Sequence, residues 1–276
     1  MNNIMTYRNF NGDIVDYYTY GSSDGYPVFY MHGAIPMPFS EPLIDFIQTH
    51  NLYVLTVLRP GYGKSTPSKH KTLFSYIQSL KPFVDHFKFK QFDVMGLSAG
   101  APYCYAMAAA YPALVRTVHI CAGVPLANNK NIFSMFSSGE KLLFSLSRHI
   151  PAGLMGRYGV KAIEAVERKK GWGTPPCGGS MDEIFENCVW PNRKGLGIST
   201  SLQYKYWGFD AEKIANKVCI YHSTEDEMIP FKIAHASAKL LQNSHLKVLK
   251  DSDHSSEKTV SAAIEDIALS NPFITH

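Results

Sequence analysis

The chain is organised around Gly96-Leu97-Ser98-Ala99-Gly100, a G-x-S-x-G pattern. The apolar residues 92–95 before it predict a short buried strand, and the Ala-rich residues 101–111 after it predict a helix. A serine between such a strand and such a helix lies in a sharp, strained turn that exposes its hydroxyl. Glycine two residues away on either side avoids a collision with that turn. The helix also directs backbone N–H groups and its positive end towards negative charge beside the serine.

Strands and helices alternate along most of the chain. Residues 4–10 and 13–20 predict a β-hairpin, because Asn-Gly joins two β-prone runs at positions 11 and 12. Short apolar runs predict buried strands at residues 28–31, 53–57, 92–95, 117–121, 218–221 and 246–249. Helical spacing of apolar residues predicts helices at residues 38–50, 73–87, 101–111 and 231–241, and a last one near the C-terminus. The alternation predicts an α/β fold with a mostly parallel central sheet covered by helices on both faces.

The alternation stops between residues 124 and 210. Helical patterns occur there without a buried strand, at residues 132–149, 153–170, 181–190 and 200–207. All three tryptophans, Trp172, Trp190 and Trp207, lie in this stretch, beside a loop at residues 171–179. We therefore expect a core formed by residues 1–123 and 211–276, with residues 124–210 as a helical insertion over the carboxyl edge of the sheet.

Two loops beyond later strand ends carry partners for the serine. A serine hydroxyl needs a histidine to take its proton and an acid that orients and stabilises this histidine. Asp226 follows the strand at residues 218–221, and His254 follows the strand at residues 246–249. Because parallel strands end at one edge of a sheet, Ser98, Asp226 and His254 are expected to meet there as nucleophile, acid and base.

The chain resembles an α/β-hydrolase along nearly all of its length outside the insertion. The resemblance rests on His32-Gly33, Arg59-Pro60-Gly61-Tyr62-Gly63-Lys64-Ser65, the G-x-S-x-G turn, Asp226 with Ile229-Pro230, and His254. It implies that the N–H groups of Ala34 and Ala99 form an oxyanion hole and that residues 124–210 are a cap. A serine at position 98 in place of aspartate argues against the haloalkane dehalogenase and epoxide hydrolase branches.

Several residues have a second interpretation. Glu225 and Glu227 flank Asp226, which its spacing from the strand and from Pro230 favours as the acid. His32 is expected to be structural, because it belongs to the turn that the resemblance assigns to the oxyanion hole. Trp190 and Trp207 can line a pocket for an acyl group or form the small core of the cap, and the sequence leaves both open.

The composition limits the class of protein. The 276 residues are 45% hydrophobic and 18% charged, as in globular proteins. A net charge of +4 without a basic stripe between aromatic residues gives no reason to expect nucleic-acid binding. No leader pattern and no apolar run of about 20 residues is found, so we expect a cytoplasmic protein without a membrane span. The five cysteines lack metal-ligand spacing and are expected mostly as buried apolar side chains in a reducing compartment.

The expected activity is hydrolysis of a small or medium carboxylic ester through an acyl-enzyme, without metal or organic cofactor. The substrate would be a small molecule with an apolar acyl or alcohol part, and the protein a monomer or homodimer. Two alternatives stay open. The same three residues could cleave a thioester or a carbon–carbon bond, or the chain could be a ligand receptor that keeps them with little turnover.

Overall fold

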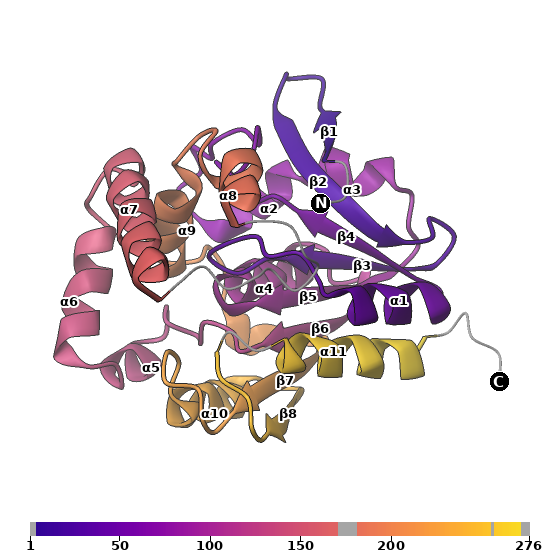
Figure 1. Ribbon diagram of the computed structural model, residues 1–276. Helices are drawn as coiled ribbons and strands as arrows, with labels where there is room; N and C mark the ends of the chain where they lie inside the picture. Colours follow the sequence, from indigo (N-terminus) through magenta and orange to yellow (C-terminus); the bar gives the residue numbers. More distant parts are fainter. Residues whose placement is uncertain (1–3, 171–180, 255–256, 272–276) are drawn as a thin grey trace.

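The structure, a computed structural model, describes residues 4–170, 181–254 and 257–271 and is built on an eight-stranded sheet (Figure 1). The strands are β1 (Met5–Arg8), β2 (Ile14–Gly21), β3 (Tyr26–Met31), β4 (Leu52–Val57), β5 (Phe92–Leu97), β6 (Val115–Cys121), β7 (Lys217–Ser223) and β8 (Ser244–Leu249). Their order is β1-β2-β4-β3-β5-β6-β7-β8. The hairpin β1–β2 and the pair β2–β4 are antiparallel, and all other pairs are parallel. The predicted mostly parallel sheet is confirmed.

Helices cover both faces of the sheet, as predicted. Outside the insertion they are α1 (Glu41–Thr49), α2 (Leu73–Ser79), α3 (Lys81–His86), α4 (Ala101–Ala110), α10 (Phe231–Leu240) and α11 (Lys258–Leu269). Leu43 of α1 and Ile264 of α11 belong to the buried cluster on one face. Ile77 of α2 and Ile233 of α10 belong to the cluster on the other face, with most of α4. Burial on both sides explains why β3 is an unbroken run of buried residues.

One predicted helix is two helices in the structure. The apolar spacing between residues 73 and 87 predicts a single helix, but the chain forms α2 and α3 with a break at Leu80. Pro82 explains the difference, because its nitrogen has no hydrogen to donate to the carbonyl oxygen of the preceding turn, whereas a proline is readily accommodated in the first turn of a new helix. The apolar face continues across the break, since Ile77 and Val84 are both buried in the same cluster.

The insertion between β6 and β7 is helical in the part that the structure describes. Its helices are α5 (Lys130–Ser134), α6 (Ser138–Ser147), α7 (Ala152–Lys170), α8 (Met181–Ile184) and α9 (Gly195–Gln203), and a π-turn follows α8 at Phe185–Val189. Trp172 and the predicted loop 171–179 lie outside the described residues. No helix among residues 4–170, 181–254 and 257–271 is long and apolar enough to cross a bilayer.

Helix α9 begins five residues before the predicted start at residue 200 and ends at Gln203. The sequence pattern did not predict its first turn, because that turn contains Gly195 and Gly197 and glycine is a poor helix former. In the structure both glycines allow close packing. A Cβ on Gly195 would lie 2.4 Å from the ring of Tyr62, and one on Gly197 would lie 2.0 Å from the carbonyl oxygen of Ala152. Tertiary contacts therefore override local preference here.

The expectation that most cysteines are buried is confirmed for those in the described part of the chain. Four thiols are free and buried, those of Cys104, Cys121, Cys188 and Cys219. Cys177 lies outside the described residues.

The turn between β5 and α4 depends on two glycines. A Cβ on Gly96 would lie 2.7 Å from Cys104 Sγ and 2.9 Å from the backbone of Gly100. A Cβ on Gly100 would lie only 2.0 Å from the carbonyl oxygen of Met31, at the end of β3. The second glycine thus lets α4 begin directly against the neighbouring strand, and the first lets the turn fold back on itself.

We expect Gly100→Ala to destabilise the fold strongly, because neither the strand end nor the helix start can move away from the added methyl. The free energy of unfolding, measured by denaturant titration, should fall by about 2 kcal/mol or more, in the range seen for overpacked cores. Gly139→Ala is the matched control, since nothing lies within 4 Å of its Cβ position. An equal loss in both variants would contradict the role assigned to the close approach.

Candidate active site

Ser98 lies in a strained turn at the carboxyl end of β5. It begins the 3₁₀ turn Ser98–Gly100 and has φ of +47°, in the left-handed region that non-glycine residues rarely adopt. The carbonyl oxygen of Ser98 accepts a hydrogen bond from the Val124 N–H at 2.9 Å, which joins the turn to the chain leaving β6. Such strain costs about 1–3 kcal/mol and persists only where the surrounding structure holds it.

A continuous hydrogen-bond relay links the three predicted catalytic residues. The Ser98 hydroxyl donates to His254 Nε2 at 2.8 Å, and His254 Nδ1–H donates to Asp226 Oδ2 at 2.9 Å. The loops after β7 and β8 carry Asp226 and His254, so all three groups come from the same edge of the sheet. The side chain of Asp226 is 1% exposed and that of His254 is 12% exposed.

Asp226 is held as an ionised acceptor. Its Oδ1 accepts hydrogen bonds from the N–H groups of Met228 at 3.0 Å and Ile229 at 2.8 Å. Burial raises the pKa of this carboxyl, but the hydrogen bonds from His254 and Ile229 outweigh burial and hold the pKa below its usual value. A neutral histidine whose Nδ1–H faces this carboxylate presents Nε2 as the acceptor for the serine proton.

The neighbouring acids occupy different surroundings. Glu225 and Glu227 are exposed, and Glu225 Oε1 accepts a hydrogen bond from the Asp251 N–H at 3.1 Å. A second imidazole, His222, lies behind Asp226 and donates from Nε2 to the carbonyl oxygen of Ile229 at 2.8 Å. Burial lowers the pKa of His222. Nothing in the sequence pattern singled out His222, which helps shape the loop that positions Asp226.

His32 is a structural residue in the geometry observed. It is completely buried, its Nδ1–H donates to the carbonyl oxygen of Gly33 at 2.7 Å, and its Nε2 accepts from the Arg59 N–H at 3.3 Å. Burial and the adjacent Arg59 guanidinium hold the pKa of His32 well below its usual value. The neutral imidazole thus links two backbone segments, because each of its nitrogens forms a hydrogen bond to one of them.

Arg59 is the main residue of the site that sequence reasoning missed. Its guanidinium is completely buried and donates to the carbonyl oxygens of Gly33 at 2.5 Å and Ala99 at 2.8 Å, and to Ser199 Oγ at 2.5 Å. It also lies over the ring of Tyr103, 4.9 Å from the centroid. Among the residues that the structure describes, no carboxylate lies within 4.0 Å of this cation. The position of Arg59 at the start of the R-P-G-x-G-x-S segment was the signal that could have identified it.

These contacts orient the two backbone segments predicted to form the oxyanion hole. The carbonyl oxygen of Gly33 receives two donors, Arg59 and His32. Since C=O and N–H point in opposite directions across a trans peptide, the Ala34 N–H is directed away from the guanidinium. Ala99 is the second residue of its 3₁₀ turn, where an N–H has no acceptor inside the turn. Its own carbonyl oxygen accepts from Arg59 and, at 2.8 Å, from Gln203 Nε2.

The structure places the two predicted cap residues differently. Trp207 is completely buried, its indole stacks on Tyr105 with centroids 6.0 Å apart, and its Nε1–H donates to Gln203 at 2.8 Å. These contacts make Trp207 part of the packed interior. Trp190 is partly exposed and donates to Glu164 Oε1 at 2.6 Å. The contacts described for these indoles bring neither of them to Ser98.

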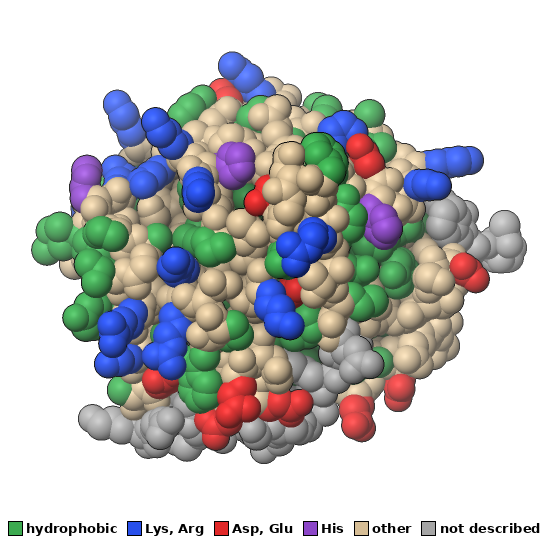
Figure 2. All heavy atoms as spheres, turned by 90° about the horizontal axis from the view of Figure 1, so that it is seen from above, with side chains coloured by type: hydrophobic (Ala, Val, Ile, Leu, Met, Phe, Trp, Pro, Cys, Tyr) green, Lys and Arg blue, Asp and Glu red, His purple; other side chains and the backbone are tan. Residues whose placement is uncertain are grey.

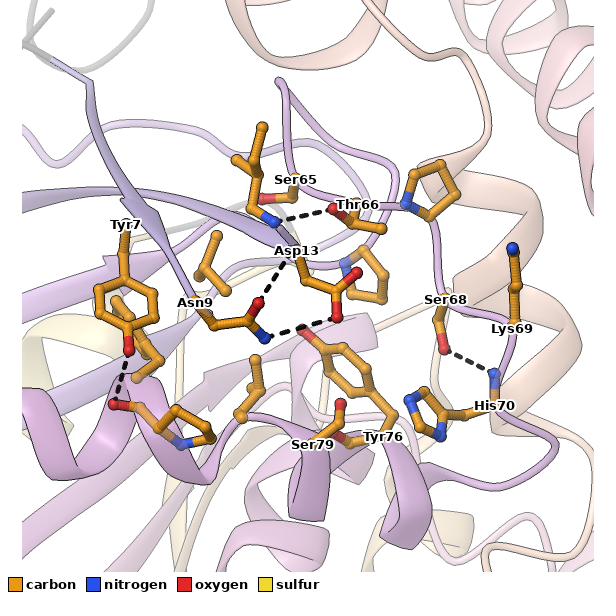
Figure 3. Close-up of a pocket in the computed structure, with 17 residues that line it drawn as sticks. Tyr7, Asn9, Asp13, Ser65, Thr66, Ser68, Lys69, His70, Tyr76 and Ser79 are labelled. Carbon is orange, nitrogen blue, oxygen red and sulfur yellow. Dashed lines mark hydrogen bonds between the residues drawn. The ribbon is translucent and has the colours of Figure 1, made fainter. Parts of the chain in front are cut away.

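A separate cleft of about 240 Å³ lies beside the β1–β2 hairpin (Figure 3). Asn9 and Asp13 of the hairpin, the segment from Ser65 to His70, and Tyr76 line it. None of Ser98, Asp226 and His254 borders it, so the cleft is not the centre of the candidate site. Within the described part of the chain, no group of three or more His, Cys, Asp and Glu side chains could hold a metal ion.

Comparison with known proteins gives a partial sequence match. A family model for the alpha/beta hydrolase fold matches residues 27–146. The uncharacterized hydrolase YcgS of Bacillus subtilis (strain 168) is 27% identical over 115 residues. This match spans 42% of the present chain and 40% of that protein, less than half of either.

Solved structures match over nearly the whole length. An esterase from Exiguobacterium antarcticum has a TM-score of 0.67 and 15% identity, covering 98% of this chain and 100% of its own. A structure described as a novel epoxide hydrolase from metagenomes of hot environments has a TM-score of 0.66 and 16% identity, covering 96% of this chain and 98% of its own. At such identities these likenesses concern the fold and not the reaction. The sheet order, the matched segment and these neighbours show that the chain has the α/β-hydrolase fold.

Proposed function

We propose that the protein is a serine hydrolase that cleaves a small or medium carboxylic ester through an acyl-enzyme intermediate. The observation that carries the proposal is the relay from Ser98 through His254 to Asp226, with distances of 2.8 and 2.9 Å. Such distances are those over which a proton passes between a nucleophile and its base. A structural neighbour is described as an esterase, which supports the same reaction class.

In the first step Ser98 Oγ attacks the ester carbonyl carbon while its proton passes to His254 Nε2. The imidazolium that forms is stabilised by the ionised Asp226 through Nδ1–H. The carbonyl oxygen becomes an oxyanion, which we assign to the N–H groups of Ala34 and Ala99. The tetrahedral intermediate then collapses, and His254 transfers the proton to the leaving alcohol oxygen.

In the second step a water molecule attacks the acyl carbon. His254 Nε2 takes one proton of the water, a second tetrahedral oxyanion forms at the same N–H groups, and the bond to Ser98 Oγ breaks as the proton returns to the serine. The products are the free carboxylic acid and the regenerated enzyme. We assign residues 124–210 to a cap that sets substrate preference, because the proposed catalytic groups all lie outside it.

Replacement of the nucleophile tests the proposal directly. Ser98→Ala should abolish covalent labelling by a fluorophosphonate probe and turnover of short ester substrates, because alanine has no oxygen to displace fluoride from the probe's phosphorus or to attack the ester carbonyl. Ser138→Ala, at an exposed position of α6, should label at the wild-type rate. Labelling of Ser98→Ala at the wild-type rate would place the nucleophile elsewhere. A panel of matched esters and thioesters then distinguishes the two substrate classes.

The assignment of the acid can be tested by comparing neighbours. Asp226→Asn should lower kcat on the order of 10⁴-fold, because an amide cannot stabilise the imidazolium and favours the wrong tautomer. Glu225→Gln and Glu227→Gln should change kcat little, since both carboxylates are exposed. A larger loss in either glutamate variant would show that the acid is not Asp226.

The buried cation gives a test of the oxyanion hole. Arg59→Met should lower kcat about tenfold or more with a smaller change in KM, because loosened donors weaken the transition state more than the bound ester. Loss of a direct donor costs about 100–1000-fold, so an indirect effect should be smaller. Arg59→Lys, which keeps the charge, should recover part of the loss, and Arg8→Met, at an exposed arginine, should have no effect. A raised KM with unchanged kcat would contradict this role.

A further inference from the structure

A hollow lined by cations lies on the insertion, apart from the candidate active site. It has a volume of about 590 Å³, within the range of ligand pockets, and is formed by α5, α6, the chain leaving β6 and the segment after α9. None of Ser98, Asp226 and His254 lines it. The cations that line this basic hollow are Lys130, Lys141, Arg148 and Lys205. Among the described residues, no acidic side chain lines it.

The four cations of the basic hollow lack a counter-charge in the described part of the chain. No carboxylate there lies within 4.0 Å of any of them. Lys141 Nζ donates to the carbonyl oxygen of Ser134 at 3.4 Å, a neutral acceptor that leaves its charge unbalanced. Cations gathered in a concave surface reinforce one another, because the walls of low dielectric constant focus their field. The basic hollow therefore attracts anions.

Arg148 is held in the hollow without a hydrogen-bond acceptor. Its guanidinium lies over the ring of Phe133, 5.0 Å from the centroid, and forms no hydrogen bond to a described residue. Its Nε is buried and has no partner. Polar groups in such a position cost free energy and call for an explanation. The contact with the ring orients the guanidinium, so its terminal N–H groups are ready to donate a forked pair of hydrogen bonds to an oxyanion.

Tyr204 adds a neutral donor to the wall of the hollow. It is 7% exposed, and its ring stacks on Phe144 with centroids 3.8 Å apart. The hydroxyl forms no hydrogen bond to a described residue, yet its oxygen is not sealed from solvent. Burial and the charge of Glu140 raise the pKa of this hydroxyl, so it keeps its proton. Glu140 itself does not line the hollow, and its carboxylate accepts from the Ser137 N–H at 2.8 Å.

We propose that the basic hollow binds a small organic phosphate. The phosphate oxygens accept hydrogen bonds from Arg148 and Tyr204, and the three lysines balance the negative charge. The ring of Tyr206, which also lines the hollow and is 69% exposed, contacts the organic part of the ligand. Lys and Arg side chains gather on the left part of Figure 2, the side on which α6 lies in Figure 1, so the field there attracts anions. The proposal concerns binding and does not depend on the reaction at Ser98.

The charges favour a phosphate over the other occupants of the hollow. A single carboxylate would leave most of the four cations unbalanced, whereas a phosphate monoester carries between one and two negative charges at neutral pH and three acceptor oxygens. A polynucleotide would need a longer basic stripe with interleaved aromatic residues, and the sequence contains none. In a dimer with two-fold symmetry the hollow would meet itself, so that cations would face cations.

The test is isothermal titration calorimetry of the full chain with phenyl phosphate, inorganic phosphate and phthalate at equal ionic strength. Phenyl phosphate should bind more tightly than inorganic phosphate, because its ring contacts the aromatic lining. Phthalate has the same ring with two carboxylates and should bind about fivefold more weakly or less tightly still, since neither carboxylate carries the charge of a phosphate. Binding of phenyl phosphate should weaken in about 1 M salt, where the Debye length is about 3 Å.

Tyr204→Phe separates binding from folding. It should weaken phenyl phosphate binding about tenfold, as expected for a lost hydrogen bond to a charged group. The thermal unfolding midpoint without ligand should stay at the wild-type value, since the hydroxyl has no partner among the described residues. Lys130→Gln and Lys205→Gln should each weaken binding about fivefold, the upper range for an exposed ion pair. Arg148→Lys keeps the charge but loses the forked donors, so it should also weaken binding.

Two controls keep the result specific. Lys90→Gln, at an exposed lysine before β5 that does not line the hollow, should bind like the wild type. Ser98→Ala should bind normally, because the hollow does not contain the nucleophile. The proposal is overturned if phenyl phosphate does not bind, if Tyr204→Phe binds as the wild type does, or if Lys90→Gln loses as much as the lysine variants of the hollow. Phthalate binding as tightly as phenyl phosphate would overturn it as well, since the hollow would then not select phosphate.

Discussion

The candidate site depends on one buried guanidinium. Arg59 bridges the carbonyl oxygens of Gly33 and Ala99, which belong to the chain leaving β3 and the turn leaving β5. These two segments carry the N–H groups that we assign to the oxyanion hole. A buried cation without a carboxylate is unfavourable unless carbonyl dipoles and aromatic faces surround it. Here the carbonyl groups that surround the cation belong to the two backbone segments of the proposed oxyanion hole. The same hydrogen bonds therefore stabilise the buried charge and fix the position of these segments.

Arg59 and Asp226 carry opposite charges on different parts of the site. In the proposed reaction the negative charge would stabilise the imidazolium, and the positive charge would lie behind the peptides that face the oxyanion. The hydrogen bonds that hold the pKa of Asp226 below its usual value keep a negative charge behind His254, where positive charge develops. Arg59 keeps a positive charge behind the peptides that would face the developing oxyanion. His32, neutral because of burial and of Arg59, separates these segments without adding a charge of its own.

The insertion is tied to this centre and also has a surface of its own. Gln203 of α9 donates a hydrogen bond to the carbonyl oxygen of Ala99, and Ser199 of α9 accepts one from Arg59. The insertion therefore contacts the turn that carries Ser98 directly. On its outer side, α6 exposes the side chains of Leu142, Leu143 and Leu146.

Strand and helix alternation in the sequence was enough to predict the parallel sheet, its two covered faces and the hairpin at its edge. It also predicted that Ser98, Asp226 and His254 lie beyond strand ends at one edge, because period, glycine placement and loop position are local properties. Their catalytic roles remain predictions. The break before Pro82 has a local cause, the proline itself, which the apolar spacing alone did not take into account. Only the tertiary structure decided the early start of α9, the burial of Trp207 and the bridging position of Arg59. Each of these three features depends on which distant segment packs against the residue, and a local sequence pattern does not identify that segment.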